Sequence, residues 1–331
     1  MPRHVKSALD ALLVGVSRKD LAARSALMTD AYRGARPSAA AVADLRDALA
    51  YAVARMPATY AATWEALSKT AERHPRLQPR TMLDLGSGPG TASLAALEMW
   101  PALERVTMLE GLQAFRDLAA EFVQAVDATR PTQAQIVAAD LLAGTETWPE
   151  ADLVMAAYVL VELPEARVPD LVLNAYNKAR QALLLIEPGT PAGFARIRVA
   201  RDALVERGAA LIAPCPHTRA CPMMSPDWCH FSVRLPRSRD HKLAKAADVP
   251  FEDERFSYLA VTRSQVAAAD GERVIAPARV SKGEIVLRTC TDHGLANRRI
   301  SRRDRLEYKA AKRLGWGDIL RHNIGFLSKT P

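Results

Sequence analysis

Residues 83–91 read Leu-Asp-Leu-Gly-Ser-Gly-Pro-Gly-Thr, and this stretch decides the fold. It continues the short apolar run Met82–Leu85 and opens a segment with helical spacing, which is the context of a nucleotide-binding glycine loop. A dinucleotide-binding loop has the spacing G-x-G-x-x-G, whereas here the third glycine comes one residue sooner and Asp84 stands two residues before the first. The pattern predicts a pocket for S-adenosylmethionine (SAM), which has no phosphate but carries an amino acid portion and a sulfonium charge.

Acidic residues also end the next two predicted strands. Glu110 follows the apolar run Val106–Leu109, where a carboxylate can accept hydrogen bonds from both ribose hydroxyls. Asp140 follows the run Gln135–Val137 and is the expected neighbour of the adenine amino group. The predicted cofactor-binding residues are Asp84, Gly86, Ser87, Gly88, Gly90, Glu110, Asp140 and Tyr158.

From Thr81 onward, short apolar runs alternate with helical stretches, which predicts a parallel sheet with crossover helices. The expected fold is therefore α/β, with the Rossmann-like sheet of class I SAM-dependent methyltransferases, an N-terminal helical cap and a Cys-rich metal-binding insertion. The predicted strands are Met82–Leu85, Val106–Leu109, Gln135–Val137, Leu153–Ala156 and Ala182–Ile186, with Phe256–Thr262 and Glu284–Thr289 expected to complete the sheet. The expected domains are a helical cap (1–76), a SAM-binding core (77–210), and a region with the cysteines, the last strands and a basic end (211–331). Within the cap, Ser38 is the expected N-cap of a helix.

Charge is unevenly distributed along the chain. Residues 1–200 hold 21 Lys and Arg against 22 Asp and Glu, while residues 201–331 hold 24 against 15. A basic second part favours a polyanionic partner, most often nucleic acid. The sequence shows neither a long apolar run nor a secretory signal, so we expect a protein outside membranes, in the cytoplasm, with the mitochondrial matrix as the alternative. We also expect a monomer.

No catalytic residue can be assigned from the sequence. Amino-methylating enzymes of this fold carry an Asn/Asp-Pro-Pro-aromatic turn after the fourth strand, and residues 156–162 read Ala-Ala-Tyr-Val-Leu-Val-Glu instead. Methylation at cytosine C5 requires a Cys nucleophile near the strand ends, but the first cysteine is Cys215. Glu187 ends the fifth predicted strand and either lines the cavity or has a structural role.

All four cysteines lie in the second part of the chain. Cys215, Cys221, Cys229 and Cys290 are separated by 5, 7 and 60 residues. Disulfides are not expected without an export signal, and three cysteines within a Pro-rich, non-periodic stretch are typical of metal ligands. Four thiolates suit either zinc or an iron–sulfur cluster, and the spacing alone leaves both open, although structural zinc commonly uses paired C-x-x-C segments that this chain lacks. His217 and His230 flank these cysteines, and Trp228 is expected to shield them.

Basic residues gather near the end of the chain. A helix from Ser301 would place several of them on one face, next to Leu306, Ala310 and Leu314 as a docking stripe. Arg234, Arg237 and other basic residues after the cysteines also favour RNA over a merely solvated helix face. The predicted RNA-binding residues are Arg298, Arg299, Arg302, Arg305, Lys309, Lys312 and Arg313.

These features together resemble the methyltransferase-like family associated with the small ribosomal subunit, which includes a mitochondrial small-subunit assembly protein and shorter bacterial relatives. The resemblance covers most of the chain and rests on residues 55–60 (RMPATY), 83–90 (LDLGSGPG), 187–191 (EPGTP), Gly193-Phe194, Cys215-Pro216-His217, Cys221-Pro222, 228–231 (WCHF), 252–258 (EDERFSY) and Trp316-Gly317-Asp318. It implies a four-iron, four-sulfur cluster on Cys215, Cys221, Cys229 and Cys290, and binding to small-subunit ribosomal RNA (rRNA) during assembly.

Three functional hypotheses follow. The first is a SAM-dependent RNA methyltransferase acting on the small ribosomal subunit. The second is a non-catalytic iron–sulfur assembly factor that uses the methyltransferase fold as a scaffold. The third is a small-molecule methyltransferase whose insertion is held by zinc.

Overall fold

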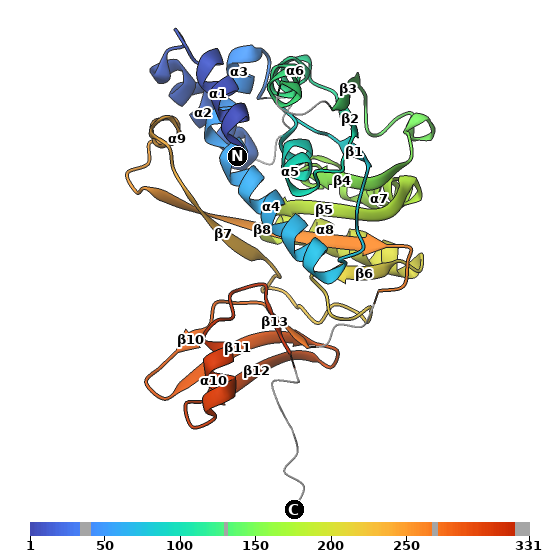
Figure 1. The fold of residues 1–331 in the computed structure, drawn as a ribbon, viewed down its shortest axis with the longest axis vertical. Coiled ribbons are helices and arrows are strands. Elements are labelled where there is room, and N and C mark those ends of the chain that lie inside the picture. The colour runs from blue at the N-terminus through green and yellow to red at the C-terminus, as the bar shows by residue number, and fades with distance from the viewer. Residues whose placement is uncertain (34–40, 129–131, 267–270, 322–331) are drawn as a thin grey trace, which may run out of the picture.

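The computed structural model describes residues 1–33, 41–128, 132–266 and 271–321. It contains a large mixed sheet flanked by helices and, below it in Figure 1, a smaller antiparallel sheet from the last part of the chain. Within the described residues, no helix is long and apolar enough to cross a membrane.

The large sheet has the strand order β3-β2-β1-β4-β5-β8-β6, with β7 paired to β8. Strands β1 to β5 are parallel and β8 is antiparallel to β5, which is the arrangement of a class I SAM-dependent methyltransferase and confirms the predicted Rossmann-like sheet. The strands are β1 (Thr81–Leu85), β2 (Arg105–Glu110), β3 (Gln133–Ala138), β4 (Ala151–Ala157), β5 (Ala179–Pro188), β6 (Ala210–Ala213), β7 (Phe231–Pro236) and β8 (Phe251–Thr262). The six predicted strands of this sheet all lie inside observed ones.

Helices cover both faces of the sheet, so β1, β4 and β5 are buried along most of their length. Apolar side chains of the cap helices, α5 and α6 form one core with one face of the sheet, and those of α7 and α8 form a second core with the other. The crossover helices are α5 (Thr91–Met99), α6 (Gln113–Asp127), α7 (Val168–Lys178) and α8 (Pro191–Glu206).

The helical cap consists of α1 (Arg3–Leu12), α2 (Arg18–Arg33), α3 (Leu45–Ala54) and α4 (Met56–Arg73). Asp44 begins α3 with a capping box: its side chain accepts a hydrogen bond from the Asp47 amide, and the Asp47 side chain accepts one from the Asp44 amide. The predicted N-cap Ser38 lies outside the described residues. Helix α4 follows α3 directly and packs on α5, β7 and β8, so the cap is continuous with the core beside the glycine loop.

The prediction that Glu284–Thr289 completes the large sheet is wrong. This segment belongs to β11 (Glu284–Thr291) of a separate sheet with the order β10-β11-β9-β13, in which β12 also pairs with β11. Ile285, Leu287 and Ile300 are buried in a small core of their own, so local hairpin pairing of β11 with β12 satisfies their burial. The other elements here are β9 (Glu272–Val274), β10 (Arg279–Val280), β12 (Gly294–Ser301), α10 (Arg305–Ala311) and β13 (Ile319–Leu320).

A cluster of charges fixes the hairpin formed by β7 and β8. Helix α9 (Arg239–Ala244) lies in its connection and packs on α2 and α3. The Glu252 carboxylate lies 3.4 Å from Nε of Arg237 and 3.0 Å from Nε2 of His241, and it accepts a short hydrogen bond from Lys245. Burial alone would raise the pKa of Glu252, but the hydrogen bonds from His241 and Lys245 hold it at about 2.

We expect Glu252→Gln to destabilise the protein by about 2 kcal/mol at pH 7, because three basic side chains lose a partly buried counter-charge. The lowered pKa means that this contribution is complete above the ordinary value of 4.5 and is lost as the pH falls towards 2. The difference in unfolding free energy between wild type and variant, measured by urea denaturation, should therefore shrink as the pH falls below 4.5. Glu104→Gln, in the exposed pair with Arg80, is the control and should change stability by less than about 0.5 kcal/mol. A pH-independent difference would contradict this assignment.

Candidate functional site

A cavity of about 620 Å³ lies where β1, β2, β3 and β4 end. Seven of the eight predicted cofactor-binding residues line it: Asp84, Gly86, Ser87, Gly88, Glu110, Asp140 and Tyr158. Gly90 does not line it but is the N-cap of α5 and packs on Met108. The fold therefore brings together predicted residues from four strand ends, because parallel strands end at the same edge of a sheet.

The glycine loop takes a conformation that other residues rarely adopt. Gly86, Gly88 and Gly90 have φ values of 65°, 55° and 84°, all in the left-handed region. A Cβ on Gly86 would lie 2.7 Å from Cγ2 of Val159, whereas Gly88 has open space around it. Gly86 is therefore required for packing against the segment after β4, and Gly88 leaves room at the cavity.

Asp84 is buried at the end of β1 with one carboxylate oxygen unsatisfied. Its Oδ2 accepts hydrogen bonds from the Ser93 amide at 3.1 Å and the Ser93 hydroxyl at 2.6 Å, while Oδ1 has no partner in the described part of the chain. Burial raises the pKa of Asp84 to about 6. A cationic ligand group at Oδ1 would favour the ionised carboxylate.

Two threonine hydroxyls add to this unsatisfied set. Thr63 on α4 is 1% exposed and Thr91 on α5 is 7% exposed, and both line the cavity. Neither Oγ1 atom has a hydrogen-bond partner in the described ranges. Thr63 was not among the predicted cofactor-binding residues, because the motif that predicts the pocket begins only at Leu83. Residues 55–60, which carry part of the resemblance, begin the same helix, with Arg55 as its N-cap, and were the available signal.

The other acids have partners already. Glu110 accepts hydrogen bonds from the amides of Gly88 and Leu112, each at 2.8 Å, and burial raises its pKa. Asp140 is exposed and accepts from the Leu142 amide at 2.9 Å. Both carboxylates retain further lone pairs for a ligand.

Glu187 has the structural role rather than the cavity-lining one. It is fully buried at the end of β5 and is not among the residues that line the cavity. Its carboxylate accepts hydrogen bonds from the amides of Val159, Leu160 and Val161 at 2.7 to 3.0 Å. These bonds fix the segment after β4, where amino-methylating enzymes have their acceptor-holding turn.

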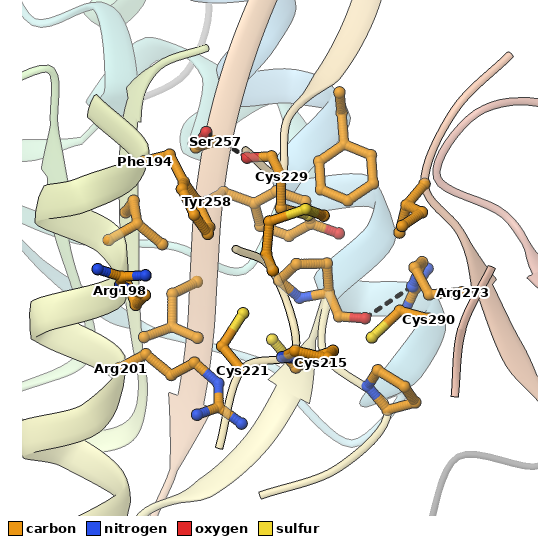
Figure 2. Close-up of a pocket in the computed structure, with 18 of the residues that line it drawn as sticks. Phe194, Arg198, Arg201, Cys215, Cys221, Cys229, Ser257, Tyr258, Arg273 and Cys290 are labelled. Carbon is orange, nitrogen blue, oxygen red and sulfur yellow. Dashed lines mark hydrogen bonds between the residues drawn. The ribbon is translucent and has the colours of Figure 1, made fainter. Parts of the chain in front are cut away.

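The four cysteines line one small cavity of about 40 Å³ between the large sheet and the second sheet. Figure 2 shows them grouped around one space. Cys290 comes from β11, and the other three come from the segment between β6 and β7. Phe194, Met223 and Ile275 form an apolar shell, and Trp228 packs against it. Cys290, which is distant in sequence, therefore lies at the same cavity as the other three cysteines.

Two buried arginines lie on opposite sides of this cavity (Figure 2). Arg201 is 3% exposed, donates to the carbonyl oxygens of His217 and Arg219, and has an Nε without a partner in the described segments. Arg273 donates to the carbonyl oxygens of Pro214 and Gly317. The cavity therefore combines four thiols with two fixed positive charges.

The described residues contain no group of three or more His, Cys, Asp or Glu arranged to hold a single metal ion. Burial raises the pKa values of the Cys215, Cys229 and Cys290 thiols. His217 lies beside the cysteines, with its Nε2 3.8 Å from Sγ of Cys290, and His230 stacks on Trp228. The structure therefore shows a cysteine-lined cavity, and metal binding by this insertion stays a prediction.

The predicted basic helix is partly wrong. Helix α10 begins only at Arg305, because β12 extends to Ser301 and a turn follows. Arg298 lies on β12 and is paired with buried Glu272, and Arg299 lies 3.4 Å from Glu284. The docking stripe also differs: Leu306 is 70% exposed, while Tyr308, Ala311 and Leu314 face the small core. The remaining five predicted residues, Arg302, Arg305, Lys309, Lys312 and Arg313, are exposed.

Comparison with known proteins places these features in a family. The sequence model described as Mitochondrial small ribosomal subunit Rsm22 matches residues 45–321. The human ribosome assembly protein METTL17, mitochondrial, is 26% identical over 287 residues, which cover 82% of this chain and 62% of that protein. The Rsm22-cox11 tandem proteins 1 and 2, mitochondrial, of Schizosaccharomyces pombe are 23% identical over 322 residues, covering 82% of this chain and 42% of each.

The chain thus spans less than two thirds of the length of these curated relatives. A solved structure of magnesium protoporphyrin IX methyltransferase from Synechocystis PCC 6803 with bound SAM is 15% identical, with a TM-score of 0.40, covering 67% of this chain and 85% of that chain. The relatives' names are all mitochondrial and give no support to the expected cytoplasmic localisation. The family match begins in the cap and extends through the large sheet to the end of the second sheet, and it confirms the resemblance stated from the sequence motifs. This chain belongs to the family described as Mitochondrial small ribosomal subunit Rsm22.

Proposed function

We propose that this chain binds SAM and small-subunit rRNA during assembly of the small ribosomal subunit. The observation that carries the SAM assignment is a set of three unsatisfied polar atoms in one cavity: Oδ1 of Asp84 and Oγ1 of Thr63 and Thr91. Buried polar groups without partners are rare in folded proteins and call for a ligand or ordered water. The amino and carboxylate groups of SAM supply both a donor and an acceptor for them.

The remaining predicted residues fit the rest of SAM. The carboxylate of Glu110, held by two loop amides, is oriented for the ribose hydroxyls, and Asp140 lies at the end of the next strand for the adenine amino group. Gly88 leaves the open space that close approach of a ligand to the backbone requires.

We expect Thr63→Val to weaken SAM binding about tenfold, because the loss of one hydrogen bond to a charged group is worth about 1.5 kcal/mol. Isothermal titration calorimetry measures the affinity, and Thr63→Ser should restore it. Thr70→Val is the matched control on the same helix, since the Thr70 hydroxyl donates to the Ala66 carbonyl instead of facing the cavity. Equal SAM affinity in Thr63→Val and wild type would remove α4 from the cofactor site. Absence of SAM binding by wild type would contradict the SAM assignment itself.

The rRNA assignment is supported by family membership and by five exposed basic residues near the end of the chain. The human relative is named a ribosome assembly protein. The short helix α10 and its flanking turns carry these side chains, which form no ion pair with any residue that the structure describes: Arg302, Arg305, Lys309, Lys312 and Arg313. Assembling small subunits would be the partner, and the relatives' names favour the mitochondrial matrix over the cytoplasm.

We expect the double variant Arg305→Gln, Lys309→Gln to bind single-stranded RNA more weakly at low salt. Each lost phosphate contact should reduce the slope of log affinity against log salt by about 0.7, so two contacts reduce it by about 1.4. Filter binding over a range of salt concentrations measures the slope. Arg80→Gln, an exposed arginine paired with Glu104 on the core, is the control. An unchanged slope in the double variant would exclude α10 from the RNA interface.

We further propose a four-iron, four-sulfur cluster on Cys215, Cys221, Cys229 and Cys290. The donor set fits this group: four thiols line one apolar cavity, and Arg201 and Arg273 offset the negative charge that four thiolates and a cluster would introduce. The family resemblance implies the cluster, and the chain lacks the paired C-x-x-C segments that structural zinc commonly uses. The cluster would join the irregular segment around Cys221 to β11 of the second sheet.

We expect protein purified without oxygen to contain about four iron atoms and four sulfides per chain, and Cys229→Ser to lose most of both. Iron, acid-labile sulfide and zinc are measured on the same samples. Ser257→Ala is the control, because its hydroxyl donates to the Cys229 carbonyl oxygen at 2.8 Å without supplying sulfur. One zinc per chain with no sulfide would support the zinc-held insertion instead.

Methylation of the bound rRNA is the second candidate function, favoured by the SAM cavity itself. The alternative is a non-catalytic assembly factor, favoured by the segment after β4, which Glu187 holds in place of the usual acceptor turn. Methylation mapping of small-subunit rRNA from cells carrying wild type or Gly88→Arg distinguishes the two.

A further inference from the structure

A second cavity, of about 380 Å³, lies on the far side of Tyr158 from the cofactor cavity. Four segments that carry the family resemblance contribute to it, and the SAM, RNA and cysteine assignments leave this cavity without a role. The four segments supply Arg55, residues 188–191, Trp228 and residues 253–255. Convergence of four segments distant in sequence on one cavity beside the cofactor indicates a ligand site.

The two cavities share a wall made by Tyr158 and Glu254. Tyr158 lines the cofactor cavity, and its hydroxyl donates a hydrogen bond of 3.0 Å to Oε1 of Glu254, which lines the second cavity. Tyr158 has a φ of 62°, uncommon for a bulky residue, and its amide is held by the Ile186 carbonyl oxygen at 2.7 Å. A ligand in the second cavity would therefore lie one side chain away from SAM.

Glu254 presents a nearly buried carboxylate to this cavity. Its side chain is 10% exposed, and Nη2 of Arg55 lies 3.5 Å from the same Oε1 atom that accepts from Tyr158. Both of these contacts use Oε1, so Oε2 is the acceptor for a donor group of a ligand. The cavity therefore favours a ligand with an N–H donor at its edge.

Trp228 and Arg255 supply the other two recognition elements. The Trp228 indole lines the cavity and donates a hydrogen bond from Nε1 to the Gly189 carbonyl oxygen at 3.0 Å. His230 covers one face of the indole, so a base would stack on the opposite face. Arg255 is exposed at the rim and carries a positive charge. A Cβ on Gly189 would lie 2.6 Å from the Arg255 backbone, so the wall between these residues is closely packed.

We propose that this cavity binds one nucleotide of an RNA strand, with an amine-bearing base that donates to Glu254, stacks at Trp228 and places its phosphate near Arg255. Sequence-specific RNA recognition commonly combines aromatic stacking with hydrogen bonds to the edge of an unpaired base. The inference rests on the proposed rRNA binding and identifies one nucleotide contact within it. Cytosine and uracil have rings of the same size, but uracil has a carbonyl oxygen in place of the cytosine amine, and a carboxylate repels that oxygen.

The test compares fluorescein-labelled cytidine and uridine 12-mers by fluorescence anisotropy at fixed salt, using the full chain. Wild type should bind the cytidine 12-mer about tenfold more tightly, since one hydrogen bond to a charged acceptor is worth about 1.5 kcal/mol. Glu254→Gln should reduce this preference to less than twofold. Trp228→Leu should weaken binding of both oligonucleotides about tenfold, since base stacking on an aromatic side chain is worth about 1 to 3 kcal/mol.

Glu284→Gln, on the second sheet, is the carboxylate control and should keep the preference. Melting temperature and SAM affinity establish that each variant is folded. Equal binding of the two oligonucleotides by wild type, or a preference that persists in folded Glu254→Gln, would overturn the proposal while leaving rRNA binding intact. If Glu254→Gln does not fold, unchanged binding by folded Trp228→Leu would overturn it. Failure of wild type to bind either 12-mer would overturn both this proposal and the proposed rRNA binding.

Discussion

The pairing of β8 with β5 is the constraint on which the rest of the structure depends. Residues 256–261 of β8 pair antiparallel with residues 183–188 of β5, and the first part of β8 continues beyond β5 to pair with β7. This one strand therefore places Glu252 against α9, Glu254 against Tyr158, and Ser257 against the Cys229 carbonyl oxygen. The cofactor cavity, the second cavity and the cysteine cavity are held at fixed positions along it.

The cofactor pocket was predictable because its chemistry is local in sequence. A glycine loop after a buried strand and an acid after each of the next two strands specify both topology and ligand, since parallel strands end at the same edge. Thr63 was not predictable in this way, because a threonine on a buried helix face looks like packing. Only the absence of a partner for its hydroxyl, a property of the folded chain, distinguishes it.

The second sheet was missed because strand pairing is not encoded in a single apolar run. Residues 284–289 contain a short apolar run (285–287) that is typical of a buried strand. The choice between the edge of the large sheet and a hairpin with β12 depends on the short turn at Asp292. The basic residues were misplaced for the same reason. Arg298 belongs to a run of basic residues predicted to bind RNA, yet β12 pairing directs it to buried Glu272. A run of arginines therefore need not form one RNA-binding face.

Glu187 shows how this chain can keep a methyltransferase fold and change what the fold is used for. Three consecutive amides after β4 donate to its buried carboxylate, so that segment is rigid before any ligand arrives. The same segment ends the cofactor cavity at Tyr158, whose hydroxyl is already bonded to Glu254. If SAM and the proposed nucleotide occupy the two cavities, the Tyr158 side chain stands between them, so methyl transfer from one to the other would require that side chain to move.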